Sequence, residues 1–171
     1  SNFTLENFTF ERFAQMLSIA PLDDAGLEGV VVRNNAFLNG GGITVVATAA
    51  DGTRATLRNM VIENNELLGP PEFGGLFPRK IHTGISLLGA PLTSPAGNGA
   101  AIVEDVTLAN NTIRGFYGGI QLTALQSYFD NSDSMLRAIR VAGNIIEMPT
   151  DAGDPAVYGD DRVFVSVGLQ T

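Results

Sequence analysis

Residues 57–68 have the sequence LRNMVIENNELL, and this stretch contains the pattern that decides the fold. Met60 and Ile62 are apolar and stand two positions apart, which is the period of a β-strand and not of a helix. The pair Asn64-Asn65 follows, and Asn is a residue typical of tight turns. Leu67 then begins another short apolar segment. The stretch therefore predicts a strand, a turn and a second short strand.

Four other segments superimpose on this stretch without gaps. They are residues 5–16 (LENFTFERFAQM), 27–38 (LEGVVVRNNAFL), 103–114 (VEDVTLANNTIR) and 136–147 (LRAIRVAGNIIE). Successive segments start 22, 30, 46 and 33 residues apart, at positions 5, 27, 57, 103 and 136. We interpret the shortest interval as one coil of a three-sided solenoid, and the excess as loops rich in Pro, Gly, Asp and Ser. The inserted loops are residues 69–80, 90–99, 127–134 and 149–161.

A further apolar segment follows each motif and predicts a third strand in each repeat. Gly42, Gly84 and Gly119 introduce three of these segments. Their sequences are Leu17-Ser18-Ile19, Ile43-Thr44-Val45, Ile85-Ser86-Leu87, Ile120-Gln121-Leu122 and Val165-Ser166-Val167. One such coil cannot bury its apolar side alone, so a continuous core requires that the coils stack.

This arrangement resembles the right-handed parallel β-helix of the pectate-lyase-like superfamily, over essentially the whole chain. The resemblance implies an all-β solenoid of about five coils, with three short strands per coil, in a single domain covering residues 1–171. It does not define an activity, because many functions are found on this fold. Enzymes of the superfamily typically use a groove on the outer face of one sheet. In members that cleave acidic polysaccharides, this face carries carboxylates, often with calcium, and an Arg or Lys base.

The second Asn of each pair predicts an internal asparagine ladder. Identical amides stacked about 4.8 Å apart can donate hydrogen bonds to one another along the solenoid axis. Asn also tolerates the left-handed backbone conformation of a tight turn. In the gapless alignment, Phe13 occupies this position in the first coil and ends the ladder with an apolar side chain. The predicted ladder consists of Asn35, Asn65, Asn111 and Asn144.

A charged column points outward on the same repeats. It predicts ion pairs between adjacent coils, with Glu28 beside Arg58 and with Glu104 between two arginines. Exposed pairs of this kind contribute only about 0–1 kcal/mol each. The column contains Glu6, Glu28, Arg58, Glu104 and Arg137.

Composition excludes several classes of partner. The chain has 171 residues and a formal net charge of −8, with 18 Asp and Glu against 10 Lys and Arg. An acidic surface is repelled by nucleic-acid phosphates and by anionic lipid, so neither is expected as a partner. No apolar run is long enough to span a bilayer. There is no Cys, which rules out disulfides and Cys-based metal sites.

The outward positions of the third strand carry no side chains suited to acid–base catalysis. They are Ser18, Thr44, Ser86, Gln121, Thr123 and Ser166, and none of them ionises near neutral pH. A glycosidase needs a paired acid and base, and a lyase needs a base beside a neutralised carboxylate. His82, the single histidine, is the one candidate general base, next to Arg79 and Lys80. A ligand-binding spot is therefore predicted at Arg79, His82, Ser86 and Gln121.

Two other groups of residues have the composition of modification or metal sites. No cofactor is predicted, but calcium is a candidate ligand of the acidic loops, because carboxylate oxygens suit this ion. These loops are Asp23-Asp24, residues 130–133 and residues 151–161, and Asp130 and Asp133 are the candidate metal ligands. A solvated acidic loop is the simpler interpretation. Asn2, Asn7 and Asn110 begin N-x-[ST] triplets, which are glycosylated only in an exported chain.

Two functions remain open from the sequence. The first is a non-enzymatic extracellular solenoid that stacks end to end. It is suggested by the ends of the pattern, neither of which has a polar cap. The alternative explanation for these open ends is that the chain is part of a longer solenoid. The repeating pattern starts with the motif strand of the first coil. It stops with residues 163–168, which are expected to form the last strand of the fifth coil. The second function is a module that binds or degrades a polysaccharide, with lyase or hydrolase chemistry. It rests on analogy of fold alone.

Overall fold

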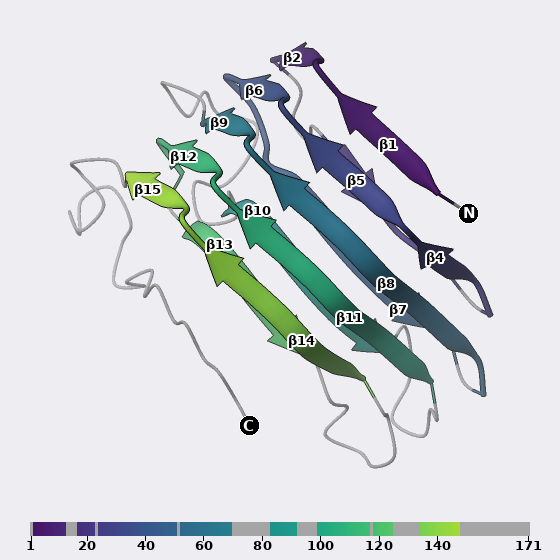
Figure 1. Cartoon of the computed structure of the whole chain (residues 1–171). Coiled ribbons are helices and arrows are strands. Elements are labelled where there is room, and N and C mark those ends of the chain that lie inside the picture. Colours follow the sequence, from purple (N-terminus) through teal and green to yellow (C-terminus); the bar gives the residue numbers. More distant parts are fainter. Residues whose placement is uncertain are drawn as a thin grey trace, which may run out of the picture.

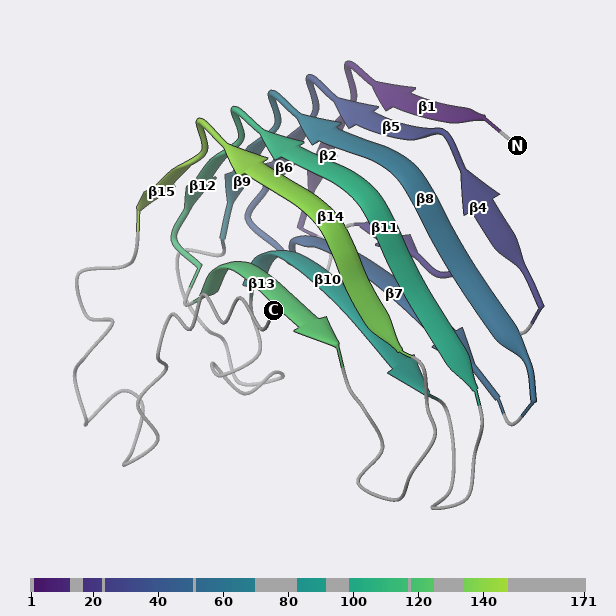
Figure 2. The ribbon, with the colours of Figure 1, turned by 60° about the horizontal axis from the view of Figure 1, so that its bottom comes forward.

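A computed structural model describes residues 2–12, 17–22, 24–50, 52–69, 83–91, 99–116, 118–124 and 134–147. These residues form fifteen β-strands and no helix. All strand pairs are parallel, and each strand pairs with the equivalent strand of the next coil. Figures 1 and 2 show the coils stacked along one axis, with the chain progressing from β1 at one end to β14 and β15 at the other. The predicted parallel β-helix is therefore confirmed.

Sheet A contains the motif strands and is the longest side of the solenoid. Its order is β1-β5-β8-β11-β14, with β4 also paired to β8. The strands are β1 (Phe3–Glu6), β4 (Gly26–Glu28), β5 (Val30–Arg33), β8 (Arg54–Glu63), β11 (Ala100–Ala109) and β14 (Met135–Ala142). In the second coil β4 and β5 together cover the length that β8 covers in the third, because β5 pairs with the second half of β8 and β4 with the first.

Sheets B and C form the other two sides. Sheet B has the order β15-β12-β9-β6-β2, and sheet C has the order β13-β10-β7-β3. The strands of sheet B are β2 (Thr9–Glu11), β6 (Ala36–Leu38), β9 (Glu66–Leu68), β12 (Thr112–Arg114) and β15 (Ile145–Glu147). Those of sheet C are β3 (Leu17–Ile19), β7 (Ile43–Ala49), β10 (Thr83–Pro91) and β13 (Gly118–Ala124). The predicted fifth strand of sheet C, around Val165, lies outside the described residues.

The core is built from apolar columns, each made of one residue per coil. In β7 every second residue, beginning with Ile43, is buried, as the strand period requires. Met60, Ile62 and Leu67 of the deciding stretch are all fully buried. Stacking places each of these side chains between two apolar neighbours in the coils above and below. The core therefore depends on adjacent coils, and no single coil contains it.

The first coil has a different register from the one that the gapless alignment predicts. Leu5 pairs with Val32, and not with Leu27, so the interval between the first two coils is 27 residues instead of 22. Phe10 pairs with Phe37, and their rings stack with centroids 5.1 Å apart. The sequence permits both alignments of the first coil, because Phe3 and Leu5 stand two positions apart, as do Phe8 and Phe10. The gapless alignment is the wrong one of the two.

Two columns of left-handed residues bend the strands of sheet A, the first column in all five coils and the second column in the second to fifth coils. The first column ends the strand at the first Asn of the pair, with φ of 54° at Asn34, Asn64 and Asn110, 64° at Asn7 and 65° at Gly143. The prediction that the second Asn adopts this conformation is therefore wrong, because the first Asn of each pair adopts it. The second column interrupts the strand at its middle, where φ is 70° at Gly29, 54° at Asn59, and 53° at Asp105 and Ala138.

The glycines that introduce sheet C are required by close packing. A Cβ on Gly42 would lie 2.1 Å from the carbonyl oxygen of Gly84. A Cβ on Gly84 would lie 2.3 Å from Cγ2 of Ile113, and one on Gly119 would lie 2.6 Å from Cγ2 of Ile146. Ile113 and Ile146 of sheet B thus fill the space that Gly84 and Gly119 leave, which holds sheets B and C close together.

Candidate functional site

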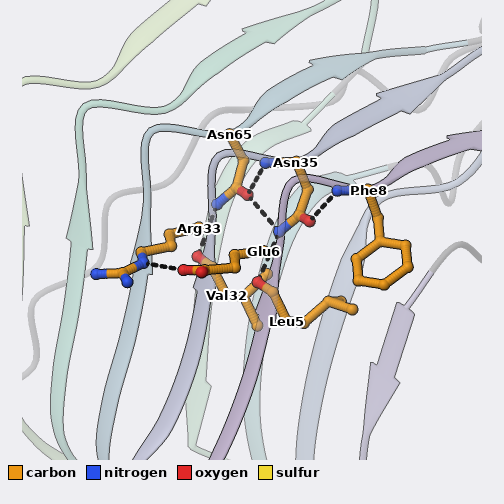
Figure 3. Close-up of polar contacts among 7 residues, drawn as sticks. All are labelled: Leu5, Glu6, Phe8, Val32, Arg33, Asn35 and Asn65. Carbon is orange, nitrogen blue, oxygen red and sulfur yellow. Dashed lines mark hydrogen bonds and ion pairs between the residues drawn. The ribbon is translucent and has the colours of Figure 1, made fainter.

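The asparagine ladder fills the turn between sheets A and B. Oδ1 of Asn65 accepts from the backbone N–H and from Nδ2 of Asn35, at 3.0 and 3.1 Å. Nδ2 of Asn65 donates to the carbonyl oxygen of Val32 at 3.0 Å and to Oδ1 of Asn111, also at 3.0 Å. Asn35, Asn65 and Asn111 are buried, so each amide is removed from water with its donors and acceptor paired. Figure 3 shows the contacts of Asn35 and Asn65. This arrangement confirms the ladder and assigns it a structural role.

The two ends of the ladder differ. At the first coil, Phe8 occupies the ladder position and only its backbone N–H takes part, donating to Oδ1 of Asn35 at 3.0 Å (Figure 3). Phe13, which was predicted to end the ladder, lies outside the described residues. At the last coil, Oδ1 of Asn144 accepts from the backbone N–H and from Nδ2 of Asn111, both at 2.9 Å. Its Nδ2 donates to the carbonyl oxygens of Leu108 and Ala142.

The charged column of sheet A is present from the second coil onward. Nη2 of Arg58 donates to Oε2 of Glu28 at 3.0 Å, and Arg137 pairs with Glu104. Glu6 does not belong to this column, because the first coil has a different register. It instead pairs with Arg33, whose Nε lies 2.6 Å from Oε2 of Glu6 (Figure 3). A further pair, between Arg114 and Glu147, joins β12 to β15.

A hollow of about 430 Å³ lies beside β4. The two carboxylates in it are already paired, since Glu28 contacts Arg58 and Glu104 contacts Arg137. The hollow therefore has the chemistry of a polar binding surface more than that of an acid–base centre. Its lining residues are Gly26, Leu27, Glu28, Arg54, Thr56, Arg58 and Glu104.

The outer face of sheet C is a neutral polar surface. Thr44, Ser86 and Gln121 stand side by side in register across β7, β10 and β13. Oγ1 of Thr83 donates to Oε1 of Gln121, and Nε2 of Gln121 donates to Oγ1 of Thr123, both at 3.3 Å. None of the residues in the four described strands of this sheet has an ionisable side chain.

The remaining predicted site residues fall into two groups. Arg79, His82, Asp130 and Asp133 lie outside the described residues, so the basic spot and the calcium loop stay predictions. Within the described residues, no group of three or more His, Cys, Asp or Glu is placed to hold a metal ion. The predicted glycosylation residues Asn2, Asn7 and Asn110 are all exposed. No helix long and apolar enough to cross a membrane occurs in the described part of the chain.

The ends of the solenoid expose the same apolar columns that are buried inside it. The column of Ile113, which is 0% exposed, ends at Ile146, which is 42% exposed. The column of Val106, also 0% exposed, begins at Phe3, which is 51% exposed. The sequence pattern located the ends in general, but the wrong register of the first coil hid Phe3 and Phe8 as the exposed residues. The large apolar side chains exposed at the ends are Phe3 and Phe8 at one end, and Val141, Ile145 and Ile146 at the other.

Comparisons with protein-family models, with curated proteins and with solved structures found no match to this chain. The function therefore has to be argued from the geometry of the two ends and of the outer faces.

Proposed function

We propose that the chain is a non-enzymatic, extracellular structural subunit whose solenoid ends stack on one another to form a filament or a surface layer. The observation that carries this proposal is the exposure of apolar core columns at both ends of the described solenoid. We call the end at β1 the head and the end at β14 and β15 the tail.

The apolar columns support stacking because they continue in the same register up to each end. At the tail, Val141 is 48% exposed, while Ile62 and Leu108 in the same column are 0% exposed. Covering such side chains with those of another coil removes apolar area from water, at about 25 cal/mol per Å². A second copy can offer a matching surface, because the apolar columns repeat from coil to coil in the same register.

The backbone at the ends supports stacking as well. β1 pairs only with β5, and β14 pairs only with β11, so each has one edge without a strand partner among the described residues. An open strand edge is a template for pairing with another chain. A copy stacked head to tail keeps all its strands parallel to those of its neighbour, as they are within one chain. The junction then repeats the pairing found between any two coils.

The alternative function, a carbohydrate-binding or polysaccharide-degrading module, is favoured by a different surface. The hydroxyl and amide groups of Thr44, Ser86 and Gln121 form a row across sheet C, and such groups hydrogen-bond to sugar hydroxyls. Membership of the pectate-lyase-like superfamily is part of this second proposal. It is tested by release of unsaturated sugars from polyuronates and by binding to a glycan panel.

Electron microscopy combined with static light scattering tests the stacking proposal. Filaments, together with an apparent mass that rises with concentration, are expected for the wild-type protein. Val141→Glu should abolish them, because it places a charge in the apolar tail. Thr44→Glu is the matched control, since it adds the same charge to a middle coil, and it should assemble normally. A wild-type protein that stays monomeric at every concentration would refute the proposal.

A further inference from the structure

We propose that the stacking is directional, head to tail, and that charges at the outer rim of sheet A select this direction. The tail presents Arg137 and Arg140, and the head presents the carboxylates of Glu6 and Glu28. This inference rests on the proposed function, because it describes how two copies of the chain would meet.

The first support is the alternation of charge along one column of sheet A. Glu28, Arg58, Glu104 and Arg137 occupy equivalent positions in four successive coils. The column is therefore acidic at its head and basic at its tail. Arg137 contacts Glu104 on the coil before it, and its side chain is still 60% exposed. A head-to-tail neighbour brings the acidic start of one column toward the basic end of another.

The second support comes from the column that contains Arg140. This column starts at Thr4 in the first coil, and Val31, Val61 and Thr107 are its members in the coils between. Arg140 is exposed, and within the described part of the chain no carboxylate pairs with it. Thr4 is exposed too, and Glu6 stands two residues further on the same face of β1.

Continuing the register across a junction therefore places Arg140 of one copy opposite Thr4 of the next. Glu6 of the next copy then lies diagonally across from Arg140, within reach of the long arginine side chain. The opposite arrangement brings like charges together, with glutamates facing glutamates at two heads and arginines facing arginines at two tails. Like charges placed opposite each other in a sheet are destabilising. The charges of sheet A thus disfavour symmetric pairs and favour a growing, polar stack.

A charge introduced at Thr4 and a charge reversed at Arg140 test the direction. Thr4→Arg places a cation opposite Arg140, and Arg140→Glu places an anion beside Glu6. Each variant alone should assemble at a concentration about threefold to tenfold higher than the wild-type protein, in low salt. An equimolar mixture should assemble as the wild-type protein does, because every junction in an alternating stack then joins opposite or native charges. The matched control is Thr44→Arg, which adds the same charge to sheet C in a middle coil.

The outcomes separate this inference from the proposed function. Recovery of assembly in the mixture supports the inference and also shows that both variants fold. Filaments that form equally well from each variant alone would overturn it, while leaving the stacking proposal intact. Loss of assembly in both variants without recovery in the mixture would also overturn it. A monomeric wild-type protein would refute the stacking proposal itself.

Discussion

The middle coils and the two end coils share one sequence pattern but differ in environment. Ile113 and Ile146 are the same residue at the same position of adjacent coils, yet the first is fully buried and the second is 42% exposed. Phe3 and Val30 differ in the same way at the other end. The difference arises from the number of neighbours, because a middle coil is covered on both sides and an end coil on one.

This comparison shows that the sequence pattern determines which column of the solenoid a residue belongs to. Whether its side chain is buried depends on whether other coils lie on both sides of it. A solenoid is stabilised mainly through interfaces between neighbouring coils, so its end coils are the least stable part. End-to-end association would convert an end coil into a middle coil. Changes at matched positions should therefore cost more in the middle of the stack than at its ends, as long as the chain is monomeric.

The largest difference is expected for the two isoleucines. Ile113→Ala should lower the free energy of unfolding by about 2–5 kcal/mol, because it leaves a cavity in a fully packed column. Ile146→Ala removes the same atoms from a half-covered site and should cost about 1 kcal/mol or less. Urea denaturation of dilute protein measures both values. Equal losses at the two positions would contradict the contrast between middle and end coils.

A smaller difference is expected within the asparagine ladder. Asn111→Ala should destabilise the protein by about 1–3 kcal/mol, because the N–H and Nδ2 groups of Asn65 lose their buried acceptor. Asn144→Ala should cost less, since Asn144 is only partly buried and water can replace it. Thermal melting of the two variants is the measurement. An unchanged melting temperature for Asn111→Ala would contradict the structural role of the ladder.

The smallest effect is a gain in stability at the last coil. Ala138 has a φ of 53°, in the column where the second coil has Gly29. Ala138→Gly should raise the free energy of unfolding by about 1 kcal/mol, because glycine adopts this conformation without steric cost. Ala142→Gly, in the same strand, should instead destabilise the protein by about 0.5–1 kcal/mol. Loss of stability in Ala138→Gly would show that this bend is not strained.

Most of the fold could be predicted from the sequence because the pattern repeats. The alternation around Met60 and Ile62 and the Asn pair after it recur with enough fidelity to define the sheets and the ladder. The first coil could not be aligned by pattern alone, because both of its apolar pairs alternate correctly. Asn7 decides between them: it takes the left-handed turn position of Asn34, which brings Phe8 to the ladder.

The candidate surfaces were less predictable than the fold. The pairing of Glu28 with Arg58 followed from their shared column, whereas the pairing of Glu6 with Arg33 required the correct register of the first coil. Arg140 went unnoticed, because its column is neutral in every other coil and no repeat pattern includes it. Burial at the ends depends on what lies beyond the last coil, and no local pattern contains that information.

Amide hydrogen exchange of β1 and β14, compared between dilute and concentrated protein, tests the central claim most directly. If the ends stack, the outward-facing amides of both strands should become protected as concentration rises, while β8 and β11 keep the protection they already have. Protection should increase in β1 and β14 together, because each junction uses one of each. Exchange that is independent of concentration in both strands would contradict the claim that the ends associate.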